Sequence, residues 1–128
     1  MKKLLFLLLA LMPLLGYAQE QKIAYCQLLG TEKFLSKKCT VQIDFGQNPY
    51  KDNRIVDEGG KSKTFNSMVD AMNFMGSLGW KFQQAYVVTI PTGMGGGQNV
   101  YHWLLSKEIG DGESINDGVK TKNDSKGE

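Results

Sequence analysis

Only one segment of the chain has the apolar period of an α-helix, and this limits the fold to a sheet with a single covering helix. The segment spans residues 64–79 (TFNSMVDAMNFMGSLG). Its apolar residues recur at the i, i+3 and i+4 spacing of one helix face: Phe65, Met68, Val69, Met72 and Met75. Thr64 can cap the first turn, and Gly79 suits the left-handed conformation that ends a helix, with Trp80 packing back.

The other patterned segments indicate β-strands. Residues 39–46 (CTVQIDFG) alternate strictly between apolar and polar side chains, as a half-buried strand does. Three further segments are rich in β-branched, aromatic and leucine residues: 23–31, 80–90 and 99–109. Polar or glycine-rich loops separate them at 47–63 and 91–98. The element order ββαββ predicts a two-layer α+β fold, in which one helix packs on an antiparallel four-stranded sheet.

The first 18 residues have the pattern of a secretory signal. Lys2 and Lys3 give a positive start, and an apolar run at 4–11 is too short to span a membrane. Small residues at Gly16 and Ala18 fit cleavage after Ala18. We therefore expect an exported protein, periplasmic or extracellular, with no membrane segment after signal cleavage.

The rest of the chain has the size and charge of one neutral domain. We expect residues 19–109 to form this domain, since the whole sequence has only 128 residues. The tail at 110–128 lacks aromatic residues and is rich in polar ones, which predicts disorder. Without Lys2 and Lys3, the 15 basic residues fall to the number of acidic ones, which is 13. A neutral chain lacks the basic surface of a nucleic-acid-binding protein, so we expect no nucleic acid partner.

The two cysteines belong to the two strands of the first hairpin. If residue 26 pairs with residue 39, the apolar side chains of both strands share one face: Ala24, Cys26, Leu28, Cys39, Val41 and Ile43. Cysteines of a short exported chain mostly pair, and opposed strand residues come close enough for a bridge. We predict a Cys26–Cys39 disulfide, which stabilises the fold by about 3 kcal/mol in the chain-entropy model.

Catalytic and cofactor sites have little support in the sequence. A nucleophile built from a cysteine and His102, the only histidine, requires a free thiol of lowered pKa. A zinc site made of both cysteines and this histidine has too few ligands. The acidic residues are scattered, and the glycine-rich run at 93–97 lacks the lysine and the following helix of a phosphate loop. We predict no catalytic residue, no metal and no cofactor.

The second hairpin carries five of the 13 aromatic side chains of the sequence. If residue 88 pairs with residue 101, one face is aromatic and the other carries smaller residues. The aromatic face then contains the residues that we predict to bind a partner: Phe82, Tyr86, Val88, Tyr101 and Trp103. In this register His102 lies opposite Val87, half-buried and satisfied by a backbone group. A slip of one residue would reverse these assignments.

One helix leaves one face of the sheet uncovered, and both faces carry apolar residues. An uncovered apolar face usually marks a contact site. Its occupant could be a second copy of the chain in a homodimer, another protein, or a flat ligand such as the ring of a glycan. The alternative is that the polar loop at 47–63 folds over this face.

Part of the sequence resembles a short bacterial domain of unknown function. The resemblance is clearest from residue 65 to 107 and extends loosely over the first hairpin. It depends on FNS followed by DAMN, on the Leu78-Gly79-Trp80 helix end and on the run VYHWLL at 100–105. It implies a helix that ends in Gly-Trp and is followed by a hairpin, as in small exported proteins of anaerobic gut-type bacteria. It implies no catalytic residues.

Three functions compete on these grounds. The first is an exported, non-enzymatic binding or assembly module that contacts its partner through a sheet face. The second is a small thiol-dependent enzyme that uses Cys26 or Cys39 with His102. The third is a carbohydrate-binding module with Tyr86, Tyr101 and Trp103 as a stacking platform. The absence of a catalytic constellation in the sequence favours the first.

Overall fold

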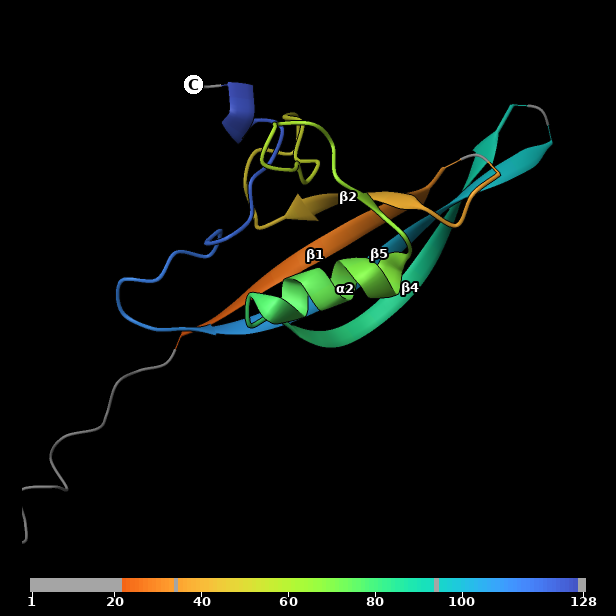
Figure 1. The fold of residues 1–128 in the computed structure, drawn as a ribbon. Helices are drawn as coiled ribbons and strands as arrows, with labels where there is room; N and C mark the ends of the chain where they lie inside the picture. Colours follow the sequence, from red (N-terminus) through yellow and green to blue (C-terminus); the bar gives the residue numbers. More distant parts are fainter. Residues whose placement is uncertain (1–21, 34, 94, 127–128) are drawn as a thin grey trace, which may run out of the picture.

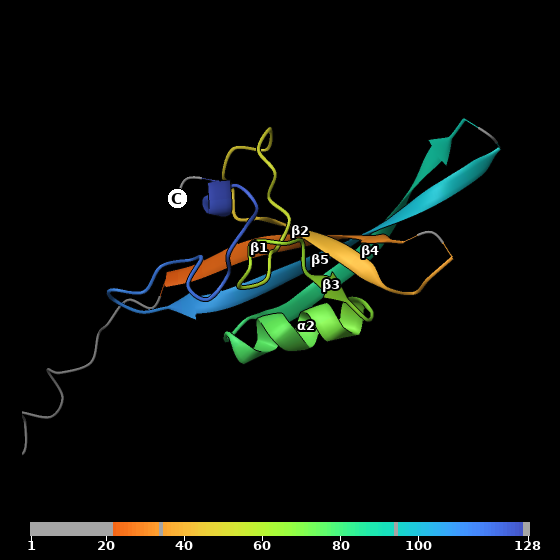
Figure 2. The same cartoon turned by 45° about the horizontal axis from the view of Figure 1, so that its top comes forward.

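The computed structural model describes residues 22–33, 35–93 and 95–126, so the export signal predicted at 1–18 lies outside the described residues. Its elements in chain order are β1 Lys22–Glu32, β2 Cys39–Asp44, β3 Thr64–Phe65, α2 Met68–Ser77, β4 Lys81–Thr92, β5 Gly96–Ile109 and a short 3₁₀ turn, Asp124–Lys126. The strands form one antiparallel sheet in the order β3-β2-β1-β5-β4 (Figure 1). Helix α2 lies along one side of this sheet, and the tip of the β4–β5 hairpin extends beyond it (Figure 2).

The predicted four-stranded ββαββ fold is wrong, because the sheet has five strands and the chain is mostly sheet. The additional strand, β3, comes from residues that we assigned to the first helical turn. Thr64 and Phe65 pair with β2, and the helix begins only after Ser67, whose side chain accepts a hydrogen bond from the Asp70 N–H at 3.2 Å. The Asp70 carboxylate in turn accepts from the Asn66 N–H at 2.9 Å. This reciprocal cap fixes the helix start three residues later than Thr64 predicts.

The end of helix α2 follows the prediction. Gly79 has the left-handed conformation, with φ of +92°, and Trp80 is buried. The Trp80 N–H donates to the Met75 carbonyl at 3.1 Å, and the Gly79 N–H donates to the Gly76 carbonyl at 3.0 Å. These two bonds satisfy carbonyls that the helix end would otherwise leave free, and they turn the chain directly into β4.

The buried side of the helix is rotated from the one we predicted. Met68, Ala71 and Met75 are buried, whereas Val69 is 60% exposed. Met68 lies directly over Gly30 of β1, where an added Cβ would overlap the methionine sulfur and come within 2.9 Å of its terminal methyl. The helix can therefore approach the centre of the sheet only because β1 has no side chain at this position.

The register of the first hairpin differs from the prediction, although the face does not. Cys39 lies opposite Glu32 rather than Cys26, because the connection is closed later, by a hydrogen bond from the Lys33 N–H to the Lys38 carbonyl at 2.8 Å. A shift by an even number of residues keeps every side chain on its side of the sheet. The predicted apolar face is confirmed as part of the core, with five members buried and one half-buried: Cys26, Leu28, Cys39, Val41 and Ile43, and Ala24.

The second hairpin differs from the prediction by one residue, which exchanges its two faces. Val87, not Val88, lies opposite Tyr101. The strands continue to Thr92 and Gly96, so only three residues join them, and Gly95 adopts φ of +77°. We predicted a longer loop because the glycines here are unusual in a strand. A short loop with a left-handed residue fixes the register instead.

The loop at 47–63 and the tail are part of the folded structure. Ile55 is buried and its N–H donates to the Val41 carbonyl at 2.9 Å, so the loop continues along the outer edge of β2. The described part of the tail pairs with this loop, for example from the Lys122 N–H to the Arg54 carbonyl at 2.9 Å, and buries Val119. Our prediction of a disordered tail rested on composition, and one buried valine with a row of backbone bonds outweighs it.

We expect two glycine-to-alanine substitutions to have opposite effects on stability. Gly30→Ala forces Met68 away from its place over β1 and lowers the free energy of unfolding by about 1–3 kcal/mol. Gly76→Ala is the matched control, because Gly76 lies in helix α2 with open space around it. It raises the free energy of unfolding by about 0.5–1 kcal/mol. Urea unfolding of both variants measures these changes. If both substitutions shift the free energy of unfolding in the same direction, the close packing of helix and sheet is contradicted.

Candidate functional site

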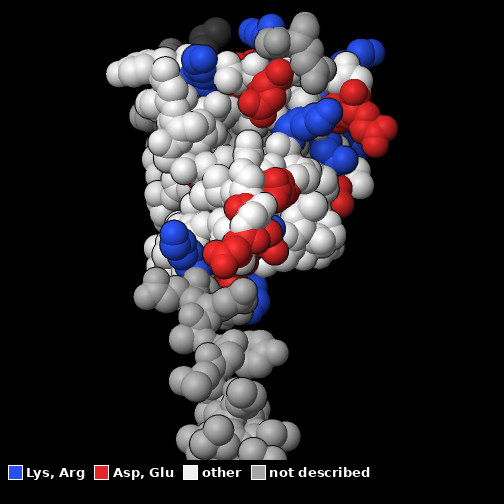
Figure 3. All heavy atoms as spheres, turned by 90° about the vertical axis from the view of Figure 1, so that its left-hand side faces the viewer, with Lys and Arg blue, Asp and Glu red and all other residues white. Residues whose placement is uncertain are grey.

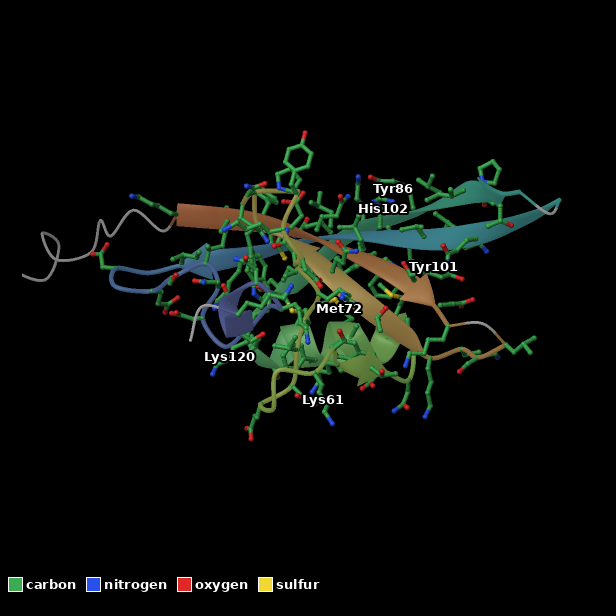
Figure 4. All side chains as sticks on the ribbon, turned by 90° about the horizontal axis from the view of Figure 1, so that it is seen from above. Lys61, Met72, Tyr86, Tyr101, His102 and Lys120 are labelled. Atoms are coloured by element: carbon green, nitrogen blue, oxygen red, sulfur yellow. The ribbon has the colours of Figure 1, made fainter. Side chains whose placement is uncertain are left out.

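The side of the sheet away from helix α2 forms a surface that we call the open face. Residues paired across antiparallel strands share a face, so Leu29, His102 and Tyr86 lie side by side on β1, β5 and β4. Figure 4 shows Tyr86 and His102 on the side of the sheet away from the helix. The same alternation gives the apolar and central residues of the open face: Ile23, Tyr25, Gln27, Leu29, Tyr86, Val88, Ile90, Val100, His102 and Leu104.

The open face is not covered by the described residues. Its outermost apolar side chains have exposed fractions between 41% and 59%: Ile23, Tyr25, Tyr86, Val88 and Ile90. The alternative that the loop at 47–63 covers this face is wrong, since that loop pairs along the edge of β2 instead. The sheet thus has one face that helix α2 covers except along β4, and one apolar face that the described residues leave open to solvent.

A stacked aromatic pair lies at the centre of the open face. The rings of Tyr86 and His102 are nearly parallel, at 8°, with centroids 4.6 Å apart. The Tyr86 hydroxyl accepts a hydrogen bond from the Gln27 side chain at 3.1 Å, which connects β4 to β1 across β5. His102 is half-buried, as predicted, but its Nδ1 atom is buried without a partner among the described residues, so this atom does not make the predicted hydrogen bond to a backbone group. The stack and the hydrogen bond connect the side chains at the centre of the face across β1, β5 and β4.

The five residues that we predicted to bind a partner divide between the two faces. Tyr86 and Val88 lie on the open face. Phe82, Tyr101 and Trp103 lie on the helix side, because of the one-residue change in register and a β-bulge between Phe82 and Gln84. The Phe82 and Trp103 rings contact edge to face at 5.3 Å. A single stacking platform of Tyr86, Tyr101 and Trp103 therefore does not exist.

Tyr101 has a structural partner on the helix side. Its hydroxyl donates to the Glu32 carboxylate at 3.0 Å, and this hydrogen bond raises the pKa of Tyr101. A shallow groove of about 290 Å³ lies beside it, lined by Cys39, Met68, Val69 and Trp103 among others. Within the described residues, no group of three metal-ligating side chains occurs here or elsewhere.

The predicted Cys26–Cys39 disulfide is wrong, because both cysteines are free and buried. Cys39 lies opposite Glu32, which is six positions along β1 from Cys26 and corresponds to roughly 20 Å of strand. Burial, together with the charge of Asp44, raises the pKa of the Cys26 thiol to about 12. Burial also raises the pKa of Cys39, with smaller contributions from Glu32 and Asp70.

These positions do not support a thiol-dependent enzyme. A catalytic thiol needs a lowered pKa and an adjacent base, and here both thiols are neutral core groups. His102 lies on the open face, whereas both cysteines lie on the helix side of the sheet. The sheet therefore separates the two kinds of residue that such an enzyme would need together.

Charged side chains are mixed in sign at the end of the molecule where β1 begins and the tail leaves β5 (Figure 3). This view shows no large surface of one charge.

Among the described residues, no helix is both long and apolar enough to cross a membrane. Comparisons of the chain with protein-family models, curated proteins and solved structures give no match.

Slow thiol alkylation is the expected consequence of this burial. At neutral pH both cysteines of the native protein react with iodoacetamide far more slowly than the same cysteines in urea, because the reactive thiolate is suppressed. Mass spectrometry of the alkylated chain counts the modified thiols. A chain that gains mass on reduction would contradict the free cysteines.

The raised pKa of Cys26 also predicts a loss of stability in alkaline solution. Above pH 9 the unfolded chain releases the thiol proton, whereas the folded chain retains it up to about pH 12. Unfolding is thus increasingly favoured as the pH rises through this range. Cys26→Ala lacks this contribution, so its stability falls less steeply between pH 9 and 11 than that of the natural chain. Urea unfolding at several pH values measures both stabilities. If the stability of Cys26→Ala falls with pH as steeply as that of the natural chain, the effect is excluded.

Proposed function

We propose that the protein is an exported, non-enzymatic binding module that contacts a protein partner through the open face. The observation that carries the proposal is the exposure of five large apolar side chains on this face, spread over β1 and β4. An antiparallel sheet that faces only water normally carries polar side chains on that side. Large exposed apolar surfaces instead mark sites of interaction.

The same sheet provides an internal comparison. On β2, the side chains that point to the open face are Thr40, Gln42 and Asp44, which are polar. On β1 and β4 the same face carries six apolar or aromatic side chains among polar ones: Ile23, Tyr25, Leu29, Tyr86, Val88 and Ile90. Polar residues beside an apolar and aromatic centre are the usual composition of a protein-binding surface.

A protein partner fits this surface better than a glycan does. Sugar rings bind to coplanar aromatic side chains, and the predicted platform is divided between two faces of the sheet. The exposed residues of the open face include the branched side chains of Ile23, Val88 and Ile90, which match apolar side chains of another protein. The export of the module rests on the signal pattern at residues 1–18.

Site-specific photocrosslinking in the source cells tests this function. A photoreactive phenylalanine derivative replaces Tyr25, which is 56% exposed on the open face, or Tyr50, which is 96% exposed on the loop at 47–63. We expect a discrete heavier adduct from position 25 and none from position 50. The absence of any adduct at position 25, or the same products from both positions, would overturn the proposal.

A further inference from the structure

A second feature, distinct from the open face, is the outer edge of β4. This strand is the last of the sheet, and all of its 12 residues are exposed. Between Lys81 and the end of the strand it carries no charged side chain. Natural edge strands usually have charges, prolines or bulges that prevent pairing with other chains. Here such features occur only near the two ends.

The direction of the free backbone groups on β4 follows from Pro91. Pro91 lies opposite Gly97 and has no N–H, so the ladder bonds around this pair come from the residues on either side of it. Antiparallel strands alternate between residues whose N–H and C=O bond to the neighbour and residues whose N–H and C=O point away from it. Since Pro91 is of the second kind, the even-numbered residues before it form the backbone hydrogen bonds to β5. The odd-numbered residues point their N–H and C=O away from the sheet: Ala85, Val87 and Thr89. Among the described residues, no backbone group of a loop or turn bonds to them.

The opposite edge of the sheet is already covered by the chain itself. Residues 53–55 pair with the outer edge of β2, beside β3. Residues 120–123 of the tail pair with the loop in turn. Within the described part of the chain, β4 is thus the long edge left for strand pairing, and it carries apolar residues on both faces.

We propose that two copies of the chain pair antiparallel along β4, about a two-fold axis at Val87. The regular part of the strand is bounded by the β-bulge at residue 83 and by Pro91. Val87 is the midpoint between these two limits. The segment that can pair is thus symmetric about the axis, and Pro91 of one copy faces the bulge of the other, where the ladder is already interrupted.

The side chains complement one another in this arrangement. On the open side, Tyr86 lies beside Val88 of the second copy, which is a favourable aromatic and β-branched pair. On the helix side, Val87 lies beside Val87 of the second copy, and Ala85 beside Thr89. The paired segment carries no charge, so no like charges oppose each other. The exposed fractions of Tyr86, Val87 and Val88, now 41% to 52%, would all decrease.

The pairing is closed rather than open-ended. Each copy uses its free edge in the two-fold contact, and its other edge is covered by the loop and the tail. The product is one continuous sheet whose two open faces lie side by side. A second copy is therefore the occupant that uses this edge completely without leaving another edge for further growth.

Analytical ultracentrifugation across a concentration series tests the dimer. We expect the natural chain to dissociate reversibly from two copies to one on dilution. Val87→Lys places two lysines on the axis and raises the dissociation constant roughly tenfold or more. Val69→Lys is the matched control, because Val69 is 60% exposed on helix α2, and leaves the constant unchanged. The proposal is overturned if the natural chain has the mass of one copy at every concentration, or if it forms assemblies larger than two copies. It is also overturned if both variants change the dissociation constant equally.

Crosslinking tests the register independently of these variants. Val87→Cys brings two engineered thiols together on the axis, and we expect oxidation to give a covalent dimer, while Val69→Cys gives none. The natural thiols are buried and do not interfere. A dimer that fails to crosslink through Val87→Cys would exclude this register. A failure of the dimer proposal can be told apart from a failure of the proposed function. The photoreactive residue at position 25 is expected to form its adduct with the protein partner even when Val87→Lys keeps the chain monomeric.

Discussion

The contact between helix α2 and the middle of β1 determines how the rest of the chain is used. Gly30 allows Met68 to lie directly over the strand, and the helix-side residues of the three neighbouring strands gather under it as the core. With one α-helix among the described residues, only one face of the sheet is covered in this way. Every apolar residue that alternates to the other side remains in contact with water.

The sequence predicted which side chains lie on the core face of the first hairpin, but not which residues are opposite one another. Alternation along the segment 39–46 depends only on the two-residue period of a strand, which can be read directly. Register depends on the length of the connection. The six-residue shift around Lys33 and Lys38 left the faces unchanged and removed the predicted disulfide.

The candidate site was predicted less well than the core, for the same physical reason. In the second hairpin the shift was odd, so Tyr86 separated from Tyr101 and Trp103 and came to lie against His102. The short turn around Gly95 could have been inferred from its glycines. The β-bulge that leaves Phe82 on the helix side has no signal in the residues Lys81 to Gln84. An apolar open face was predictable from the composition, whereas its members were not.

The free edge and the open face have a common origin in the position of β4. A strand at the border of the sheet receives neighbours only from β5, and helix α2 contacts it only sparsely, so its residues are exposed on both sides. On the other border, the loop and the tail provide the missing backbone partners of β2. The asymmetry is therefore built by the chain order: the tail follows β5 but returns to the far border, beyond β1 and β2. Because the described residues that follow β5 go to that border, β4 keeps apolar side chains in contact with water and backbone groups that point outward.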